Sequence, residues 1–248
     1  MRRTIFGGVA TALLVVLASA GTASAGPVSF TMTATVGGAP MAGTILDNLD
    51  WLSLGAGGGT SPQSGIIVSF GTGILPGLGG QAVTGFSVNV YAAPYLSGSN
   101  GIGFGNSPVP GSDTSIYISS GSTEANTNPN ANFEILLPHP NSYYFGLLWG
   151  SIDWYNTLSF YDGLNLLFSV TGTDVDPNAN GSQGLEGTRY VNFTSDTPFN
   201  RVVATSSITA FEIDNVAVVA SPEPASMVLF GTGLVALAGV ARRRMRKQ

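Results

Sequence analysis

Residues 157–170 read TLSFYDGLNLLFSV, two apolar runs separated by the pair Asp162-Gly163. An Asp-Gly pair between such runs is a strong signal for a β-hairpin, because a type I′ turn needs positive φ at both central positions. The stretch therefore predicts two antiparallel strands, over 157–161 and 164–170, joined by a type I′ turn at Asp162-Gly163.

Further β-prone runs flank this hairpin, while helical periodicity is nearly absent from residues 26–221. The runs cover 28–36, 66–70, 86–91, 115–118, 133–137, 143–149, 189–194, 199–204 and 211–219. The apolar positions of the last run are Phe211, Ile213, Val216 and Val218. Many short strands between Gly- and Pro-rich turns predict an all-β, antiparallel β-sandwich. The roughly 196 residues between the two ends are ample for one such domain.

The composition narrows the classes of function. The chain has 248 residues, no cysteine and 9% charged residues. Absence of cysteine excludes a disulfide framework, thiol catalysis and thiolate metal sites. Between residues 26 and 221 the basic residues are Arg189 and Arg201, while that stretch holds every acidic residue except Glu223. Such an acidic body cannot neutralise a phosphate backbone, so nucleic acid is excluded as a partner, and any attachment to a membrane must come from the ends.

The first 25 residues have the three parts of a secretory signal peptide. Arg2 and Arg3 form the positive region, residues 5–18 are almost continuously apolar, and Ala23 and Ala25 supply the small residues of a cleavage site. This pattern predicts export by the general secretory route and cleavage by signal peptidase after Ala25. The alternative is an uncleaved membrane anchor, for which the apolar stretch is short.

The C-terminal end has a different three-part organisation. Pro222, Glu223 and Pro224 precede an apolar run over 225–241. A basic cluster follows at once and comprises Arg242, Arg243, Arg244, Arg246 and Lys247. A helix over the apolar run is roughly 25 Å long, short for a bilayer core of about 30 Å, although flanking arginines can snorkel. The pattern predicts a transmembrane helix with the basic tail in the cytoplasm and the body outside.

This order of Pro-Glu-Pro, short helix and terminal basic cluster resembles the PEP-CTERM sorting signal. The resemblance implies that a membrane-embedded exosortase recognises residues 222–248 and cleaves near Pro222–Pro224, after transient membrane anchoring. It also implies a Gram-negative host that makes exopolysaccharide, and a place for the mature protein at the cell surface or in the extracellular matrix of a biofilm. An ordinary tail anchor is the alternative. The predicted organisation is thus a signal peptide (1–25), a β-sandwich (26–221) and a sorting signal (222–248).

Part of the body carries a second resemblance. Residues 145–153 (FGLLWGSID), 155–158 (YNTL), 189–193 (RYVNF) and 211–216 (FEIDNV) are similar to blocks that recur in exosortase-dependent surface proteins. The closing FEIDNV strand is similar to that of jelly-roll, carbohydrate-binding-like sandwiches, which implies a jelly-roll-like fold. A fold analogy alone does not establish sugar binding.

Asp153, Trp154 and Tyr155 are the candidate glycan contacts, close after Trp149. Exposed aromatic rings beside a carboxylate suit the apolar face and the hydroxyl groups of a sugar. Aromatic residues buried in a sandwich core would give the same sequence. Both interpretations stay open, so a carbohydrate-binding module is the alternative to a surface protein without a specific ligand.

Asp174, Asp176, Asn178 and Asn180 place oxygen-bearing side chains at alternate positions. Calcium prefers such ligands, and the spacing is similar to the first half of an EF-hand loop. The fit is imperfect, because Ala179 stands where a loop starting at Asp174 needs glycine. An ordinary turn rich in Asp and Asn is the alternative. A structural Ca²⁺ is therefore the one cofactor considered.

No catalytic group is recognisable in the sequence. His139, the single histidine, lies between two prolines that favour an extended loop, and no nucleophile elbow is found. Glu212 and Asp214 share a strand face, but a glycosidase pair needs carboxyl groups about 5–10 Å apart across a cleft. We therefore expect an exported protein without enzymatic activity.

Overall fold

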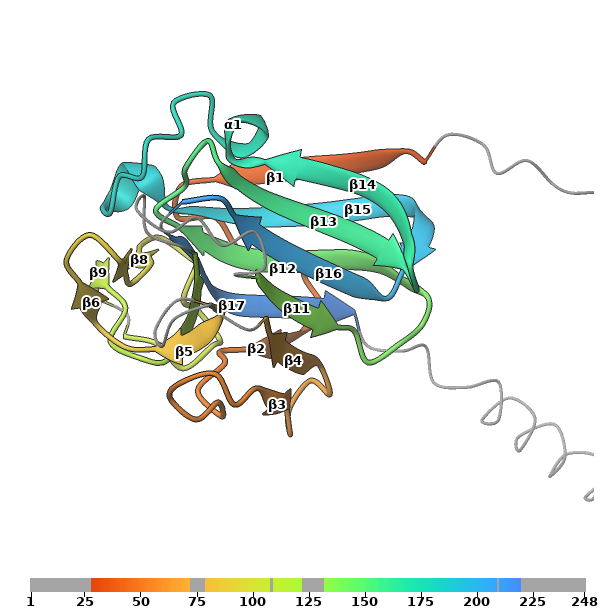
Figure 1. The fold of residues 1–248 in the computed structure, drawn as a ribbon, viewed down its shortest axis with the longest axis horizontal. Helices are drawn as coiled ribbons and strands as arrows, with labels where there is room; N and C mark the ends of the chain where they lie inside the picture. The colour runs from red at the N-terminus through yellow and green to blue at the C-terminus, as the bar shows by residue number, and fades with distance from the viewer. Residues whose placement is uncertain (1–27, 72–78, 108, 122–131, 209, 220–248) are drawn as a thin grey trace, which may run out of the picture.

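The computed structural model describes residues 28–71, 79–107, 109–121, 132–208 and 210–219. Most of the strands in these residues belong to two antiparallel sheets that lie face to face (Figure 1). Helical structure in the same residues is limited to α1 (Gly172–Val175) and the 3₁₀ turn η1 (Leu185–Gly187). The prediction of an all-β body is confirmed.

The predicted signal peptide and the predicted helix over 225–241 lie outside the described residues. Within the described ranges, no helix has the length and apolarity needed to cross a membrane. The domain boundaries at the two ends therefore remain predictions.

The strands form two large sheets and two small hairpins. In spatial order, the seven-stranded sheet contains β1 (Phe30–Thr35), β15 (Arg189–Phe199), β12 (Ser142–Gly150), β17 (Phe211–Val219), β10 (Tyr117–Ser120) and β5 (Gln81–Val83), with β2 (Thr44–Asp47) also paired to β17. The six-stranded sheet contains β14 (Asn165–Thr171), β13 (Asn156–Asp162), β16 (Arg201–Ser206), β11 (Asn132–Leu136), β4 (Ile67–Phe70) and β3 (Gly59–Thr60). The hairpins pair β6 (Phe86–Ser87) with β7 (Tyr91–Ala92), and β8 (Tyr95–Leu96) with β9 (Gly111–Ser112).

Eight consecutive strands, β10 to β17, build the centre of the sandwich. Four stand in the order β10-β17-β12-β15 in one sheet, and the other four stand in the order β11-β16-β13-β14 in the other. The chain alternates between the sheets in this segment, except at the β13–β14 hairpin. This arrangement is that of a jelly roll.

The main core fills the space between the sheets. Trp149 stacks on Phe211 with ring centroids 4.3 Å apart. The Phe160 ring has its centroid 4.4 Å from that of Phe168 and 4.8 Å from that of Phe193. These side chains alternate along their strands with residues on the opposite face, as the period of two in a β-strand requires.

A second layer covers the outer face of the seven-stranded sheet. It consists of residues 91–107 and 109–113, and we call it the outer layer. Leu96 and Phe104 of this layer pack against Tyr144, Leu148 and Tyr190 of the sheet. Because β12 is covered on both faces, its sequence is a continuous apolar run rather than an alternating one.

Strand β17 changes its side-chain phase in the middle. The register against β12 shifts between Gly146 and Leu148, and Asn215 has a positive φ of 49°. One extra residue in a strand is a β-bulge, and it moves the following side chains to the other face. This bulge explains why the core positions run Phe211 and Ile213, then Val216 and Val218. Before the bulge, Glu212 and Asp214 alternate with Phe211 and Ile213 and so face away from the main core.

The hairpin over residues 157–170 is confirmed, but the predicted type I′ turn is wrong. Asp162 pairs with Asn165, so the two-residue loop is Gly163-Leu164, and positive φ occurs at Gly163 (58°) and not at Asp162. Positive φ at the first loop position only is the pattern of a type II′ turn. The Asn200 side chain donates to Asp162 Oδ1 and accepts from the Gly163 amide, which holds Asp162 at the strand end.

The run over 86–91 is also not the single strand that was predicted. It forms β6, a turn and the first residue of β7. Asn89 takes a positive φ of 59°, and the Val90 amide donates to the Ser87 carbonyl. Asn tolerates the left-handed conformation, so this apolar run folds back on itself. The run at 115–118 enters a strand only at Tyr117.

Candidate functional site

A cavity of about 200 Å³ lies beside the β12–β13 connection, and we call it the polar pocket. Its walls come from the connection itself, from the β6–β7 hairpin, from residues 180–183 and from the start of β17. The polar side chains in its lining include those of Tyr91, Ser151, Asp153, Tyr155, Asn180 and Glu212. Lys, Arg and His are absent from the described lining.

Two close backbone approaches fix the position of Asp153. A Cβ on Gly172 would lie 2.0 Å from the Asp153 carbonyl oxygen, and a Cβ on Gly181 would lie 2.7 Å from Asp153 Oδ2. Asp153 and Asn180 form an isolated antiparallel bridge, and the Gly181 amide donates to the Ile152 carbonyl. Only glycine fits at both contacts, so the loop that carries the Asp153 carboxylate packs closely against Gly172 and Gly181.

Two carboxyl groups meet in the polar pocket. Asp153 is 8% exposed and accepts a hydrogen bond from the Tyr155 hydroxyl at 2.7 Å. Glu212 is 2% exposed, and its Oε1 accepts from the Ala92 amide at 3.0 Å. Glu212 Oε2 has no hydrogen-bond partner among the described residues. Both carboxyl groups thus accept hydrogen bonds in a poorly solvated place.

Burial alters the acidity of both carboxyl groups. It raises the pKa of Glu212 to about 8, and the charge of Asp153 adds to that effect. It also raises the pKa of Asp153, although the hydrogen bond from Tyr155 opposes the change. Loss of water disfavours a charged carboxylate, and a second carboxylate nearby disfavours it further.

The aromatic residues of this segment divide between core and surface. Trp149 is buried and stacks on Phe211, so for it the core interpretation is correct. Trp154 is 60% exposed, and its ring lies edge-on to Tyr155 with centroids 5.3 Å apart. Because Tyr155 lines the polar pocket, Trp154 stands next to it. The structure thus brings together the three candidate glycan contacts, Asp153, Trp154 and Tyr155.

Glu212 and Asp214 share one face of β17, as the sequence predicts, but their surroundings differ. Glu212 lines the polar pocket, whereas Asp214 is fully buried beneath the outer layer. Burial raises the pKa of Asp214 well above its ordinary value, and the neighbouring Asp113 adds to the effect. Glu212 lies opposite Gly150, the last residue of β12, and Asp153 follows in the β12–β13 connection. Glu212 therefore shares the pocket with Asp153.

The four residues of the EF-hand-like stretch have different partners. Asp174 Oδ2 accepts from the amide and hydroxyl of Thr171, which caps α1 and lowers the Asp174 pKa. Asp176 pairs with Arg189. Asn178 donates its amide to Asp176, and Asn180 lines the polar pocket. In the described part of the chain, no three His, Asp or Glu side chains are placed to hold a metal. Calcium at this stretch remains a prediction.

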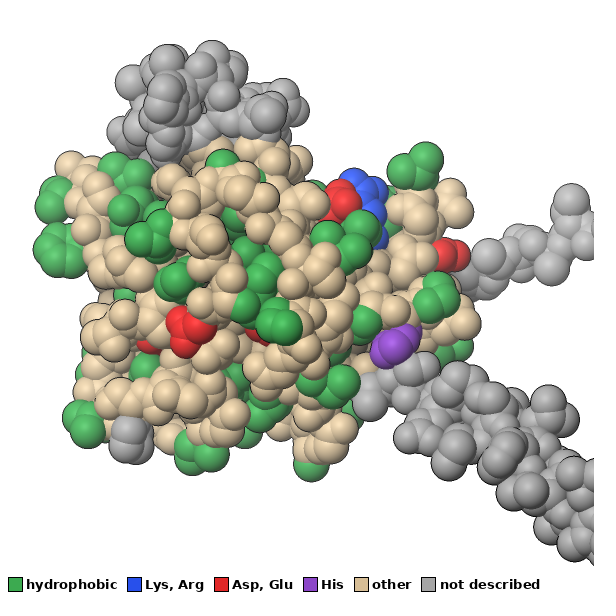
Figure 2. Space-filling model, turned by 90° about the horizontal axis from the view of Figure 1, so that it is seen from below, with side chains coloured by type: hydrophobic (Ala, Val, Ile, Leu, Met, Phe, Trp, Pro, Cys, Tyr) green, Lys and Arg blue, Asp and Glu red, His purple; other side chains and the backbone are tan. Residues whose placement is uncertain are grey.

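His139 lies in the β11–β12 connection and contributes its carbonyl to a hydrogen bond from Ser142. Figure 2 shows one face of the molecule, on which charged and histidine side chains are few among polar and apolar ones. The lining of the polar pocket does not include His139.

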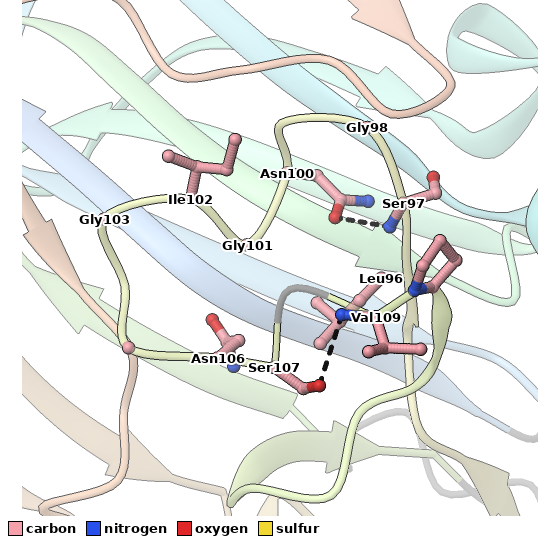
Figure 3. Close-up of a pocket in the computed structure, with 12 residues that line it drawn as sticks. Leu96, Ser97, Gly98, Asn100, Gly101, Ile102, Gly103, Asn106, Ser107 and Val109 are labelled. Atoms are coloured by element: carbon pink, nitrogen blue, oxygen red, sulfur yellow. Dashed lines mark hydrogen bonds between the residues drawn. The ribbon is translucent and has the colours of Figure 1, made fainter.

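A larger cavity of about 580 Å³ lies within the outer layer (Figure 3). Its walls are formed mainly by glycine and small polar residues between Leu96 and Pro110. Asn100 accepts from the Ser97 amide, and Ser107 accepts from the Val109 amide. Its described lining holds no charged or aromatic side chain. We therefore place the candidate site in the polar pocket.

Comparison with known families concerns the C-terminal end of the chain. Residues 222–247 match the family model described as the PEP-CTERM protein-sorting motif. The chain carries a PEP-CTERM motif. The motif includes Pro222, Glu223 and Pro224 and the basic cluster, all of which lie outside the described residues. A search of curated proteins finds no match for the chain.

The PEP-CTERM motif gives the protein its cellular context. It implies export, processing by an exosortase and sorting to the cell envelope. The β-sandwich is thus the body of an exosortase-targeted surface protein, and the polar pocket belongs to that body.

Proposed function

We propose that the β-sandwich is a non-enzymatic module that binds an extracellular glycan, such as exopolysaccharide, at Trp154 and the polar pocket. The observation that carries this proposal is the 60% exposure of Trp154 directly beside a pocket with two carboxyl groups. A sugar ring has an apolar face that packs on an indole and hydroxyl groups that bond to polar side chains. Sites with one aromatic surface and a few convergent polar groups suit such ligands.

The geometry around Trp154 supports a binding role. A single exposed apolar side chain is common on protein surfaces and needs no explanation by itself. Here, however, Tyr155 links the Trp154 ring to the pocket, since its ring contacts the indole and its hydroxyl donates to Asp153. An indole held in this way loses less conformational freedom when a sugar packs on it.

The environment of the carboxyl groups supports binding rather than hydrolysis. A glycosidase places one carboxyl group on each side of the bond that it cleaves, within reach of the substrate. Asp153 and Glu212 are both more than nine-tenths buried, and each already accepts a hydrogen bond. In this proposal the mature body, freed from its sorting tail near Pro222–Pro224, lies at the cell surface or in the matrix.

A binding comparison tests the proposal. The exported protein from its host is applied to the host's exopolysaccharide and to a glycan array, with Trp154→Ala as the variant. We expect Trp154→Ala to weaken binding at least tenfold, a loss of about 1.4 kcal/mol. Tyr143→Ala is the matched control, because Tyr143 is also exposed (46%) and does not line the pocket.

Two results would contradict the proposal. The first is equal binding by the wild type and Trp154→Ala. The second is release of reducing sugar from the glycan by the wild type and not by Glu212→Gln, which would make the protein an enzyme.

A further inference from the structure

Among the described residues, the carboxyl groups of the polar pocket have no basic partner. Arg189 and Arg201 are the basic residues between positions 26 and 221. Arg189 pairs with Asp176, and Arg201 pairs with Glu134. Asp153 and Glu212 are therefore left without a protein cation in the described chain. Two buried acids in one cavity need a proton or a bound cation for charge balance.

The pocket also contains oxygen atoms that lack a partner among the described residues. These are Glu212 Oε2 and Ser151 Oγ, on side chains that are 2% and 6% exposed. A buried polar atom without a hydrogen bond is costly, and it calls for an explanation. Both residues line the pocket. Ser151, which is not an acid, is thus an independent sign of a ligand.

The backbone at Ser151 is held in an unusual conformation. Its φ is 41°, in the region that glycine occupies most readily. A residue other than glycine held in such a conformation costs on the order of 1–3 kcal/mol, and strain of this kind is often found at ligand sites. Ser151 is the first residue of the β12–β13 connection. It follows Gly150, which pairs with Glu212, and it precedes the loop that carries Asp153.

The donor atoms indicate the class of cation. Carboxylate, amide and hydroxyl oxygens are hard ligands, which Ca²⁺ binds with six to eight oxygens in flexible geometries. The pocket supplies such atoms from Asp153, Ser151 and Glu212, and from Asn180, whose side-chain oxygen also accepts from the Ser182 amide. Its volume of about 200 Å³ exceeds that of an ion with a few waters, each of which occupies about 30 Å³.

We propose that the polar pocket binds Ca²⁺ through the carboxylates of Asp153 and Glu212, assisted by the side-chain oxygens of Ser151 and Asn180. This site differs from the EF-hand-like interpretation, with which it shares only Asn180. An ion here connects the start of β17, the β12–β13 connection and the loop around Asn180. The site needs no glycan, so it stands or falls independently of the function proposed above.

Calcium titration of the exported protein tests this proposal. After treatment with EGTA and buffer exchange, the full protein is titrated with Ca²⁺ by calorimetry and with Tb³⁺ by luminescence excited through the aromatic residues. We expect one site with a dissociation constant on the order of 10⁻⁴–10⁻³ M, as in other extracellular calcium modules. Glu212→Gln and Asp153→Asn are expected to weaken it at least tenfold.

Two matched variants separate this site from the other acidic positions. Asp174→Asn changes the EF-hand-like stretch, and Asp113→Asn changes the acidic neighbour of Asp214. Both are expected to bind Ca²⁺ as the wild type does. Binding lost in either variant and kept in Glu212→Gln would overturn the proposal, and so would absence of binding by the wild type at millimolar Ca²⁺.

Thermal unfolding shows whether a variant that fails to bind Ca²⁺ is still folded. Ca²⁺ at 10 mM is expected to raise the Tm of the wild type by a few degrees, because a ligand of the native state stabilises it. Glu212→Gln should still unfold cooperatively in EGTA and show no such rise. An equal rise in the wild type and in a folded Glu212→Gln would contradict the assignment.

Discussion

Replacement of Glu212 by glutamine should change how stability depends on pH when calcium is chelated. Burial raises the pKa of this carboxyl group from 4.5 to about 8 in the folded protein. Between these values the folded state keeps a proton that the unfolded state releases. The stabilisation is therefore complete below about pH 4.5, and it is lost as the pH rises to about 8.

The size of this effect follows from the two pKa values. They differ by about 3.5, and each pH unit in that window is worth about 1.4 kcal/mol for one proton. Full ionisation of Glu212 should thus lower the free energy of unfolding by about 5 kcal/mol, of which about 4 kcal/mol falls between pH 4.5 and 8. Glutamine keeps the size of the side chain and an oxygen for the Ala92 amide, but it has no proton to release.

Urea denaturation in EGTA at pH 5 and at pH 8.5 measures the difference. The wild type should lose more stability over this range than Glu212→Gln does, by about 4 kcal/mol. Asp153 and Asp214 also have raised pKa values, so both proteins should lose some stability as the pH rises. Equal losses in the two proteins would show that Glu212 is not protonated in the folded state.

Four further substitutions test the packing, the ion pairs and the turn of the sandwich. Phe160→Ala should lower the free energy of unfolding by about 5 kcal/mol, because Phe160 is fully buried and contacts several phenylalanine rings. Urea denaturation checks it, and a loss under about 2 kcal/mol would contradict the core described above. Arg189→Ala should cost about 3 kcal/mol and Arg201→Ala under 1 kcal/mol, because the pair made by Arg189 is the more buried one. Comparable losses in the two variants would show that burial does not distinguish the pairs. Gly163→Ala should cost about 1 kcal/mol through its positive φ, and an unchanged urea midpoint would disprove the assigned turn.

Much of the sandwich could be predicted because its longest strands carry their own local signals. The run over 211–219 coincides with β17, and the hairpin around Gly163 is present. The bulge in β17 is also visible in the sequence, because the apolar positions change from odd to even residue numbers between Ile213 and Val216. The turn type was wrong because the Asn200 side chain, distant in sequence, holds Asp162 in the strand.

The outer layer was the part of the fold that sequence patterns did not reveal. Its strands, such as β8 and β9, are only two residues long, too short for a recognisable period. It is held instead by tertiary contacts, such as the packing of Phe104 near Tyr190 and the hydrogen bond from Asn215 to the Asn100 carbonyl. These contacts bury Asp214, which a strand pattern alone leaves at the surface.

The candidate site could be predicted in part. The local cluster of Asp153, Trp154 and Tyr155 was visible because the three residues are adjacent in sequence. The exposure of Trp154 was not, because side-chain alternation no longer applies after β12 ends at Gly150. The approach of Glu212 to Asp153 depends on the register between β12 and β17, which no local pattern specifies.

We infer that this chain is an exported surface protein trimmed at both ends, and the mass of its mature form is the decisive measurement. Intact mass and terminal peptides should be measured for the protein from its native host, with and without its exosortase. We expect an N-terminus at Gly26 and a C-terminus near Glu223, with the tail kept only when the exosortase is absent. A mature wild-type protein that still carries residues 242–248 would contradict it, and the tail would then be a plain membrane anchor.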